Sequence, residues 1–207
     1  TRVRSSAASD VYKRQERCNL DPGFHYVIFC GGFHPWTDFD LMLDAFSVVA
    51  AEQTDARLLL VGDGPERQRI VRRTENLSLG SKVIMTGLIH ERTRVRDYLG
   101  AATAALLLYR TDVVTRTSAS PVKLNEYLAS GRAVVAAEIP GVRALVEDPG
   151  AGIIVDGSVS AVAEAVLELL RDPERADAMG VSGRRFAEER LSWRVVVRRT
   201  LPLFGIV

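Results

Sequence analysis

Two opposite charges stand three residues apart in the segment SASPVKLNEYLASG (Ser118 to Gly131), namely Lys123 and Glu126. Side chains at this spacing lie on the same face of a helix. They could form a surface ion pair, which contributes at most about 0.5 kcal/mol. They could also hold one ligand, with Lys123 facing an anion and Glu126 accepting hydrogen bonds from hydroxyl groups. A ribose next to a diphosphate would match both charges.

The residues before Lys123 indicate where this helix begins. Ser120 is a good N-cap, and Pro121 suits the first helical position because its missing amide would have no partner there. The free amides of the first turn and the positive end of the helix dipole together favour an anion. Lys123 lies in that first turn, where the dipole disfavours a cation by about 0.3 to 1 kcal/mol. A residue that local rules disfavour indicates a functional role.

Six short apolar runs, separated by amphipathic segments, must position this helix. The expected strands are HYVIFC (25–30), ARLLLVG (56–62), KVIMTG (82–87), AALLLY (104–109), AVVAAE (133–138) and GIIVD (152–156). Continuous rather than alternating apolarity indicates that helices cover both faces of the sheet. Three helical segments follow the last strand, and we expect them to pack outside the sheet. The predicted fold class is therefore α/β, a doubly wound parallel sheet of about six strands in one domain.

Ligands of open parallel sheets bind outside the carboxyl ends of the strands, so the loops there are the candidate site. These loops are GGFHPWTD (31–38), GDGPE (62–66), GLIHE (87–91) and YRTDVVTRTSASPVK (109–123). Neither glycine pair completes the G-x-G-x-x-G dinucleotide pattern, because Arg67 stands where the third glycine of the second loop would be. A nicotinamide-dependent dehydrogenase is only weakly supported. The P-loop pattern is absent, which disfavours a P-loop nucleotide hydrolase.

Composition and charge exclude several other classes. The chain has 207 residues, of which 47% are hydrophobic, and a formal net charge of +1, so it lacks the basic field that binds nucleic acid. The two cysteines, Cys18 and Cys30, are too few for a disulfide framework or a four-cysteine zinc site and fit a reducing cytoplasm. No apolar run approaches the roughly 18 residues of a transmembrane helix. We expect a cytoplasmic protein, at most peripheral at the inner face of the membrane.

The first residues share no pattern with the rest of the chain. The sequence begins at Thr1 without a methionine, and SSAASDVYKRQ (5–15) resembles translated adapter sequence found at the ends of metagenomic reading frames. We therefore expect residues 1–17 to be a non-native leader and leave them out of the fold prediction, as is done for processing segments. The predicted domain comprises residues 18–207.

Four motifs in order carry a family resemblance. SPVKLNEYLASGRAVVAAEIPG (120–141) resembles the nucleotide-binding segment of retaining glycosyltransferases with the GT-B fold, family 4, also described as glycosyl transferases group 1. GGFHPW, VGDGPE and VIMTGLIHERTRVRDYLGAAT are similar to other signposts of that family and occur in the same order. The resemblance covers about residues 25–200. It implies the C-terminal, donor-binding domain of such an enzyme, the Rossmann-like half of a GT-B fold.

The resemblance also implies roles for individual residues. Glu126 would bind the ribose hydroxyls, Lys123 would face the diphosphate, and Leu88 and Ile89 would hold the base. The full set of implied nucleotide-sugar-binding residues is Gly31, Gly32, Leu88, Ile89, Ser118, Ala119, Ser120, Pro121, Lys123, Leu124 and Glu126. Similar enzymes use UDP-, GDP- or ADP-sugars without a bound metal or other cofactor, and transfer the glycosyl group to an acceptor with retention of configuration. An absent N-terminal domain would contact the acceptor, a glycan or a lipid-linked glycan; no catalytic residue is assigned.

Two departures from the family pattern keep alternatives open. Family members often carry two glutamates separated by seven residues, but Ser118 occupies the first position here. Many also carry Arg and Lys in the first loop, where Gly31 and Thr37 stand, so Lys123 is the one clear phosphate-binding cation. The alternatives are a non-catalytic nucleotide-sugar-binding module and a GT-B sugar-nucleotide epimerase. Trp36 and Trp193 are interpreted as packing anchors of the first loop and of the last helix.

Overall fold

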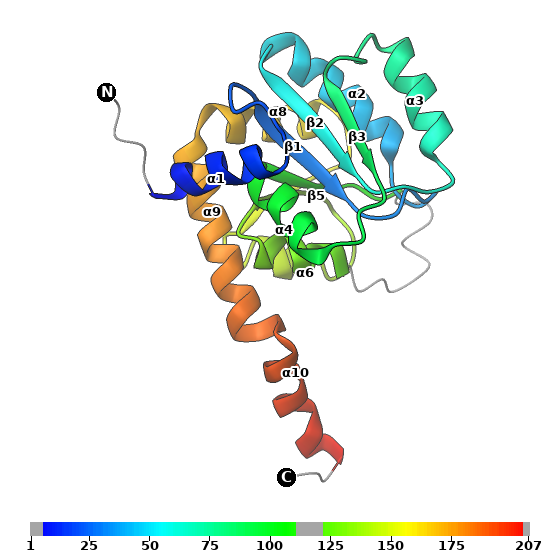
Figure 1. Cartoon of the computed structure of the whole chain (residues 1–207). Helices are drawn as coiled ribbons and strands as arrows, with labels where there is room; N and C mark the ends of the chain where they lie inside the picture. Colours follow the sequence, from blue (N-terminus) through cyan, green and yellow to red (C-terminus); the bar gives the residue numbers. More distant parts are fainter. Residues whose placement is uncertain (1–5, 111–121, 205–207) are drawn as a thin grey trace.

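A parallel sheet of six strands forms the centre of the molecule (Figure 1). The structure is a computed structural model that describes residues 6–110 and 122–204. The strands in these ranges are β1 (His25–Cys30), β2 (Ala56–Val61), β3 (Val83–Gly87), β4 (Ala104–Leu107), β5 (Ala133–Ala137) and β6 (Gly152–Val155). Each coincides with one of the six predicted apolar runs.

The strand order, β3-β2-β1-β4-β5-β6, places β1 and β4 side by side in the middle of the sheet. β1 pairs with β2 along its whole length, from His25 opposite Ala56 to Cys30 opposite Val61. Within the described ranges, it pairs with β4 only at Val27 and Ile28. The direction of winding reverses between β1 and β4, so the carboxyl ends of these two strands border the crevice in which doubly wound folds bind ligands.

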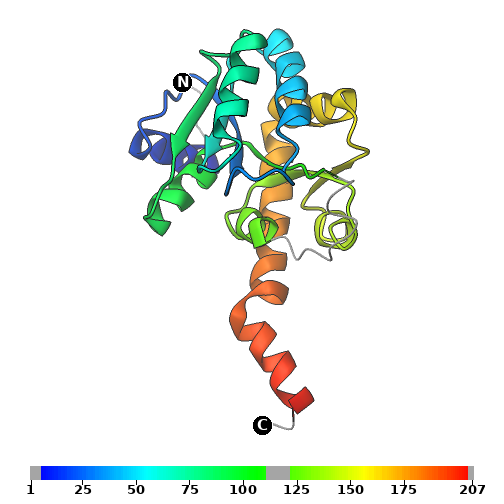
Figure 2. The ribbon, with the colours of Figure 1, turned by 90° about the vertical axis from the view of Figure 1, so that its right-hand side faces the viewer.

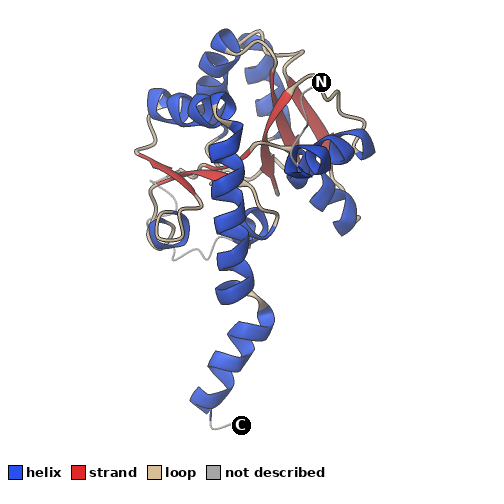
Figure 3. Cartoon of the chain, turned by 90° about the vertical axis from the view of Figure 1, so that its left-hand side faces the viewer, coloured by secondary structure: helices blue, strands red, loops and turns tan. Residues whose placement is uncertain are grey.

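Helices cover both faces of the sheet, as Figure 3 shows with the strands in red and the helices in blue. The described helices are α1 (Ser6–Arg17), α2 (Phe39–Glu52), α3 (Arg67–Asn76), α4 (Arg92–Ala101), α6 (Val122–Ala129), α7 (Arg143–Val146), α8 (Val159–Arg171), α9 (Pro173–Phe186) and α10 (Trp193–Thr200), with a π-helical turn η1 (Ala187–Leu191) and a 3-10 turn η2 (Leu201–Phe204). The predicted doubly wound α/β fold is confirmed.

Alternate residues of each strand pack into two separate hydrophobic cores, one on each face of the sheet. Val27 and Phe29 of β1 pack with α2, α3 and α8, whereas Tyr26, Ile28 and Cys30 pack with α4, α6 and α7. This follows from the two-residue period of a strand, which points successive side chains to opposite faces. Because both faces are buried, apolar residues run continuously along the strand.

The last helix departs from the prediction. α8 and α9 contribute buried residues to the core, but α10 has none, and the chain beyond α9 extends away from the sheet (Figure 2). Trp193 at its start is 82% exposed, so the interpretation of this residue as a packing anchor is wrong. The apolar side of α10 faces α6 only across an open hollow, so neither helix buries the other there. The expectation that all C-terminal helices pack outside the sheet therefore holds for α8 and α9 alone.

The segment left out of the fold prediction forms a helix. α1 lies against α4, where the Arg17 guanidinium donates two hydrogen bonds to Asp97, at 2.9 and 2.7 Å. Gln15 is buried and its Nε2 donates to the carbonyl of Ala101 at 3.3 Å. Residues 6–17 thus have a place in the structure that their sequence did not indicate. That residues 1–17 are a non-native leader stays a prediction.

Candidate functional site

The glycine loops after β1 and β2 pack directly against each other. Gly31 and Gly62 have positive φ angles of 147° and 139°. A Cβ atom on Gly62 would lie 2.1 Å from the carbonyl oxygen of Gly31, and one on Gly64 would lie 2.6 Å from that of Phe33. The Phe33 amide donates to the Asp63 carbonyl at 2.9 Å. These glycines therefore permit close approach of two backbones, which explains glycine pairs that complete no dinucleotide pattern.

The side chain of Lys123 crosses the first of these loops. A Cβ atom on Gly31 would lie 2.2 Å from Cε of Lys123, so this path exists because position 31 has no side chain. The Lys123 ammonium lies 5.2 Å from the ring centroid of Phe29 and 5.4 Å from that of Tyr109. The two rings stabilise the cation through their π faces. Lys123 thereby connects α6 with the carboxyl ends of β1 and β4.

The surroundings of Lys123 are unusual for a lysine. Its side chain is half-buried, and this burial lowers the pKa of the ammonium group, while the neighbouring Cys30 and Glu126 raise it. Among the described residues, no ion pair within 4.0 Å and no hydrogen bond joins Lys123 to Glu126. The alternative of a simple surface pair is therefore not realised. A desolvated cation beside aromatic rings favours an incoming anion.

Glu126 instead borders a groove of about 810 Å³ between the β3–α4 loop, α4 and α6. Ile89 and His90 line the groove on the loop side, and Glu126 and Ala129 on the α6 side. The structure thus brings Ile89, one of the two residues expected at the base, to the same groove as Glu126, which is expected at the ribose. Trp193 also borders the groove, a position that its sequence context did not reveal.

Leu88 lies apart from its neighbour Ile89. Leu88 is 64% exposed and does not border the large groove, although both residues line a smaller hollow of about 310 Å³ with Glu91 and Tyr98. Ile89 borders both spaces. Of the two residues expected at the base, Ile89 therefore shares a groove with Glu126, and Leu88 does not.

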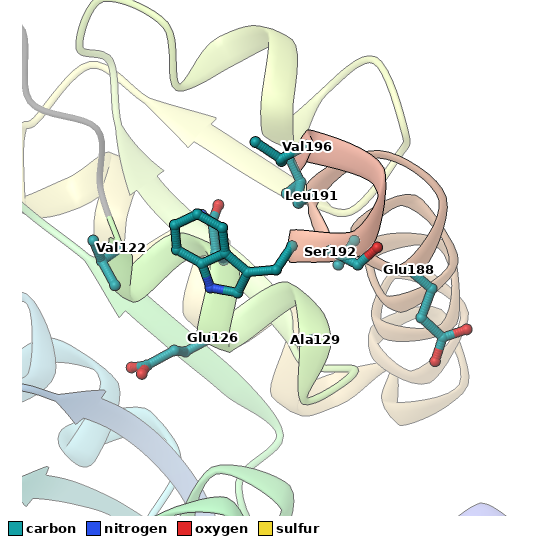
Figure 4. Close-up of a pocket in the computed structure, with 10 residues that line it drawn as sticks. Val122, Glu126, Ala129, Glu188, Leu191, Ser192 and Val196 are labelled. Atoms are coloured by element: carbon teal, nitrogen blue, oxygen red, sulfur yellow. The ribbon is translucent and has the colours of Figure 1, made fainter. Parts of the chain in front are cut away.

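A second hollow, of about 530 Å³, separates α6 from η1 and the start of α10. Figure 4 shows Val122 and Glu126 along α6 opposite Leu191 and Val196, with the Glu126 carboxylate directed away from α10. The lining of this hollow is mainly apolar. Glu126 thus lines both this hollow and the groove that it shares with Ile89.

The remaining expected residues have different positions. Leu124 is fully buried, with 0% exposure, and packs in the core beneath α6, so the expectation that it contacts a ligand is not supported by its position. Gly32 lies beneath His34, whose Nε2 would be 2.5 Å from an added Cβ, and His34 stacks on the 42% exposed Trp36 with ring centroids 4.2 Å apart. Trp36 therefore packs within the first loop, as expected of an anchor, but at the protein surface. Ser118, Ala119, Ser120 and Pro121 lie outside the described residues, as does the predicted helix start at Ser120.

Two further observations concern metals and membranes. Within residues 6–110 and 122–204, no three His, Cys, Asp or Glu side chains are grouped so that they could hold a metal ion. No described helix combines the length and the apolarity that crossing a membrane requires. A metal-free donor site stays a prediction.

The comparisons with known proteins agree with the fold. A family model described as Glycosyl transferases group 1 matches residues 25–172. The GDP-mannose-dependent alpha-(1-6)-phosphatidylinositol monomannoside mannosyltransferase of Mycolicibacterium smegmatis is 30% identical over 167 residues, which cover 80% of this chain and 44% of that protein. The D-inositol 3-phosphate glycosyltransferase of Segniliparus rotundus is 30% identical over 179 residues, which cover 84% of this chain and 38% of that protein. The chain spans about two fifths of the length of these relatives.

Solved structures share the fold at lower sequence identity. A sucrose-phosphate synthase from Thermosynechococcus elongatus is similar with a TM-score of 0.79 and 21% identity, covering 94% of this chain and 48% of that one. The C-terminal domain of a glycosyl transferase group 1 family protein from Francisella tularensis is similar with a TM-score of 0.72 and 14% identity, covering 87% of this chain and 92% of that one. Because the family model matches well over half of the residues, the chain belongs to the glycosyl transferases group 1 family.

Proposed function

We propose that residues 18–207 form the donor-binding domain of a retaining glycosyltransferase that takes a nucleoside-diphosphate sugar. The observation that carries this proposal is the arrangement on α6. Glu126 borders a groove with Ile89, while Lys123, three residues earlier, reaches over Gly31 to the carboxyl end of β1. The base and ribose would occupy the groove, and the diphosphate would lie at Lys123.

The spacing on α6 suits such a ligand. Three residues of helix advance about 4.5 Å along the axis, which is comparable with the step from a ribose to its attached phosphates. The Glu126 carboxylate can accept hydrogen bonds from two adjacent ribose hydroxyls. The half-buried Lys123 has given up part of its hydration already, so a phosphate meets a less shielded charge there than at the protein surface.

Lys123 would also assist the reaction. When the bond between sugar and phosphate breaks, negative charge accumulates on the terminal phosphate of the departing nucleoside diphosphate. A cation held in place before the reaction stabilises that charge without reorganising. The acceptor would be a glycan or lipid-linked glycan, contacted by an N-terminal domain of the same enzyme, and the donor would need no metal. We place the enzyme in the cytoplasm, with peripheral attachment to the inner face of the membrane as the alternative.

Relatives suggest donors without deciding between them. The name of the Mycolicibacterium relative says that it depends on GDP-mannose, and one structurally similar protein from Anabaena was solved with UDP and glucose. UDP, GDP and ADP should therefore all be titrated into the 207-residue chain by calorimetry, together with the variants Lys123→Ala and Glu126→Ala. If each charged hydrogen bond contributes about 1.5 to 3 kcal/mol, each variant should weaken binding roughly 10- to 150-fold.

Two matched variants serve as controls. Lys82→Ala removes a lysine whose Nζ donates to the Ala50 carbonyl at 2.5 Å, just before β3 and away from the carboxyl ends of the strands. Glu164→Ala removes an exposed carboxylate from α8, on the opposite face of the sheet from α6. Both should bind as the wild type does. A folded wild-type chain that binds none of the three nucleotides would refute the proposed function.

A further inference from the structure

The carboxyl end of β1 lacks a strand partner on one side. Its pairing with β4 ends at Ile28, whereas its pairing with β2 continues to Cys30 and then to Gly31, whose amide donates to the Val61 carbonyl at 2.9 Å. Successive residues of a strand direct their amide and carbonyl groups to alternate sides. The backbone groups of Cys30 therefore face the side of β4, where the strand pairing has already ended.

A single hydroxyl group fills this gap. The Cys30 amide donates to Oη of Tyr127 at 3.0 Å, and the Tyr127 hydroxyl donates to the Cys30 carbonyl at 3.1 Å. Tyr127 is fully buried, and this burial raises the pKa of its phenol well above the ordinary value, so the hydroxyl keeps its proton. The side chain thus acts as both donor and acceptor in place of a strand.

The position of Tyr127 in the chain makes this contact relevant to the site. It follows Glu126 directly on α6, and its partner Cys30 directly precedes Gly31, over which Lys123 lies. The hydroxyl therefore joins the helix that carries both candidate charges to the loop that the diphosphate would approach. Within the described part of the chain, no other side-chain hydrogen bond links α6 to β1.

We infer that Tyr127 is a positioning residue for the diphosphate of the donor. It sets the distance between the Gly31–Gly32 loop and Lys123 through its two hydrogen bonds to Cys30. This assignment rests on the proposed function. It predicts a selective defect, because the base and ribose lie along the groove at Ile89 and Glu126, whereas only the phosphates reach the β1 loop.

The test is to compare Tyr127→Phe with the wild type for binding of a nucleoside diphosphate and of its nucleoside. The diphosphate is whichever of UDP, GDP and ADP the wild-type chain binds most tightly. In Tyr127→Phe the ratio of nucleoside Kd to diphosphate Kd should fall about tenfold, because the two Cys30 groups lose their partner and the loop relaxes. Binding of the nucleoside alone should stay within about twofold.

Tyr26→Phe is the matched control. Tyr26 is also buried on β1, but at the other end of the strand, where its hydroxyl donates to the Asp21 carbonyl at 2.9 Å. This variant should lose stability as Tyr127→Phe does and keep the wild-type ratio of dissociation constants. An unchanged ratio in a folded Tyr127→Phe protein would overturn the assignment while leaving the proposed function intact. A wild-type chain that binds no diphosphate would overturn both.

Hydrogen exchange provides a second measurement if Tyr127→Phe does not fold. In the wild-type chain, the diphosphate should slow amide exchange at Cys30, Gly31 and Gly32, because it would hold the loop against α6. The nucleoside should leave these amides unchanged. Equal protection by the two ligands, or none by the diphosphate, would overturn the assignment.

Discussion

Replacing Gly31 by alanine should weaken nucleoside-diphosphate binding without touching a charged residue. The new Cβ would lie 2.2 Å from Cε and 3.1 Å from Cδ of Lys123, so the lysine side chain has to leave its path across the loop. The Lys123 ammonium would then lose its position near the rings of Phe29 and Tyr109. The phosphate-binding cation would still be present in the protein, but in another place.

The size of the effect follows from two separate terms. The φ angle of 147° at Gly31 disfavours any residue with a Cβ, at about 1 to 3 kcal/mol of stability. For a domain of this size, that lowers Tm by roughly 2 to 12 °C, at about 2 to 4 °C for each kcal/mol. Loss of the charged hydrogen bond from Lys123 would weaken diphosphate binding by roughly 10- to 150-fold.

A variant at a second glycine, Gly141, distinguishes the effect of backbone strain from the effect of displacing the Lys123 side chain. Gly141 also has a positive φ angle, of 83°, but a Cβ there would meet no atom within 4 Å. Gly141→Ala should therefore lower Tm to a similar extent and bind the diphosphate as the wild type does. Calorimetric titration and thermal unfolding of the two variants, in the same buffer, give both quantities.

A double-mutant cycle decides whether Lys123 is the cause. In a Lys123→Ala background the shortened side chain no longer lies over position 31, so Gly31→Ala should cause no further loss of affinity. If Gly31→Ala weakens binding as much in that background as in the wild type, displacement of the lysine is not the reason. The path of Lys123 across the loop would then have no role in binding.

Three further variants test the site and the packing around it. Lys123→Met should raise the Tm of the ligand-free chain by about 2 to 4 °C at neutral pH, because it removes a desolvated cation. Burial lowers the pKa of Lys123, so the folded protein releases this proton at a lower pH than the unfolded chain does. The free energy of unfolding of the wild type should therefore rise as the pH approaches the ordinary lysine pKa of 10.5. Urea titrations across this pH range should show no such rise in Lys123→Met. Glu126→Gln should weaken binding of ribonucleosides and of ribonucleoside diphosphates about tenfold or more. It should also reduce the preference for ribose over 2′-deoxyribose. If calorimetry shows an unchanged preference, Glu126 does not bind the ribose. Gly180→Ala should destabilise the folded chain by about 1 to 3 kcal/mol although alanine is the better helix former, because its Cβ would lie 2.1 Å from the Gly131 carbonyl oxygen. In Gly80→Ala the new Cβ would have no atom within 4 Å. Chemical denaturation should therefore show no such loss of stability for Gly80→Ala.

The order of elements could be predicted because it depends on local patterns. A fully buried parallel strand needs a short continuous apolar run, and six such runs, each bounded by turn residues, correspond to β1 to β6. The position of the site at the carboxyl ends of the strands follows from the topology of doubly wound sheets in general. The spacing of Lys123 and Glu126 likewise indicated that the two charges share one helix.

The roles of these charges depended on contacts between distant parts of the chain. Spacing alone left open whether Lys123 and Glu126 pair with each other, and the answer lies in Gly31, which is 92 positions before Lys123 and leaves a path for its side chain. The contact of Tyr127 with Cys30 was equally hidden, because a tyrosine at this place in a helix has the same local pattern as any other core residue. Such contacts depend on which strand ends meet which helix.

The structure near both ends of the chain also differs from what the local sequence pattern predicts. The apolar residues of α10 predicted packing, yet Trp193 stays exposed because an open hollow separates it from α6. The segment 6–17 carried no fold signal, yet Arg17 meets Asp97 on α4. By itself the sequence determined the strands, their order along the chain and the helix with the two charges, since these follow from residue type and period. Only the tertiary structure decided what each side chain faces, because burial and charge pairing depend on neighbours that the chain brings together only when it folds.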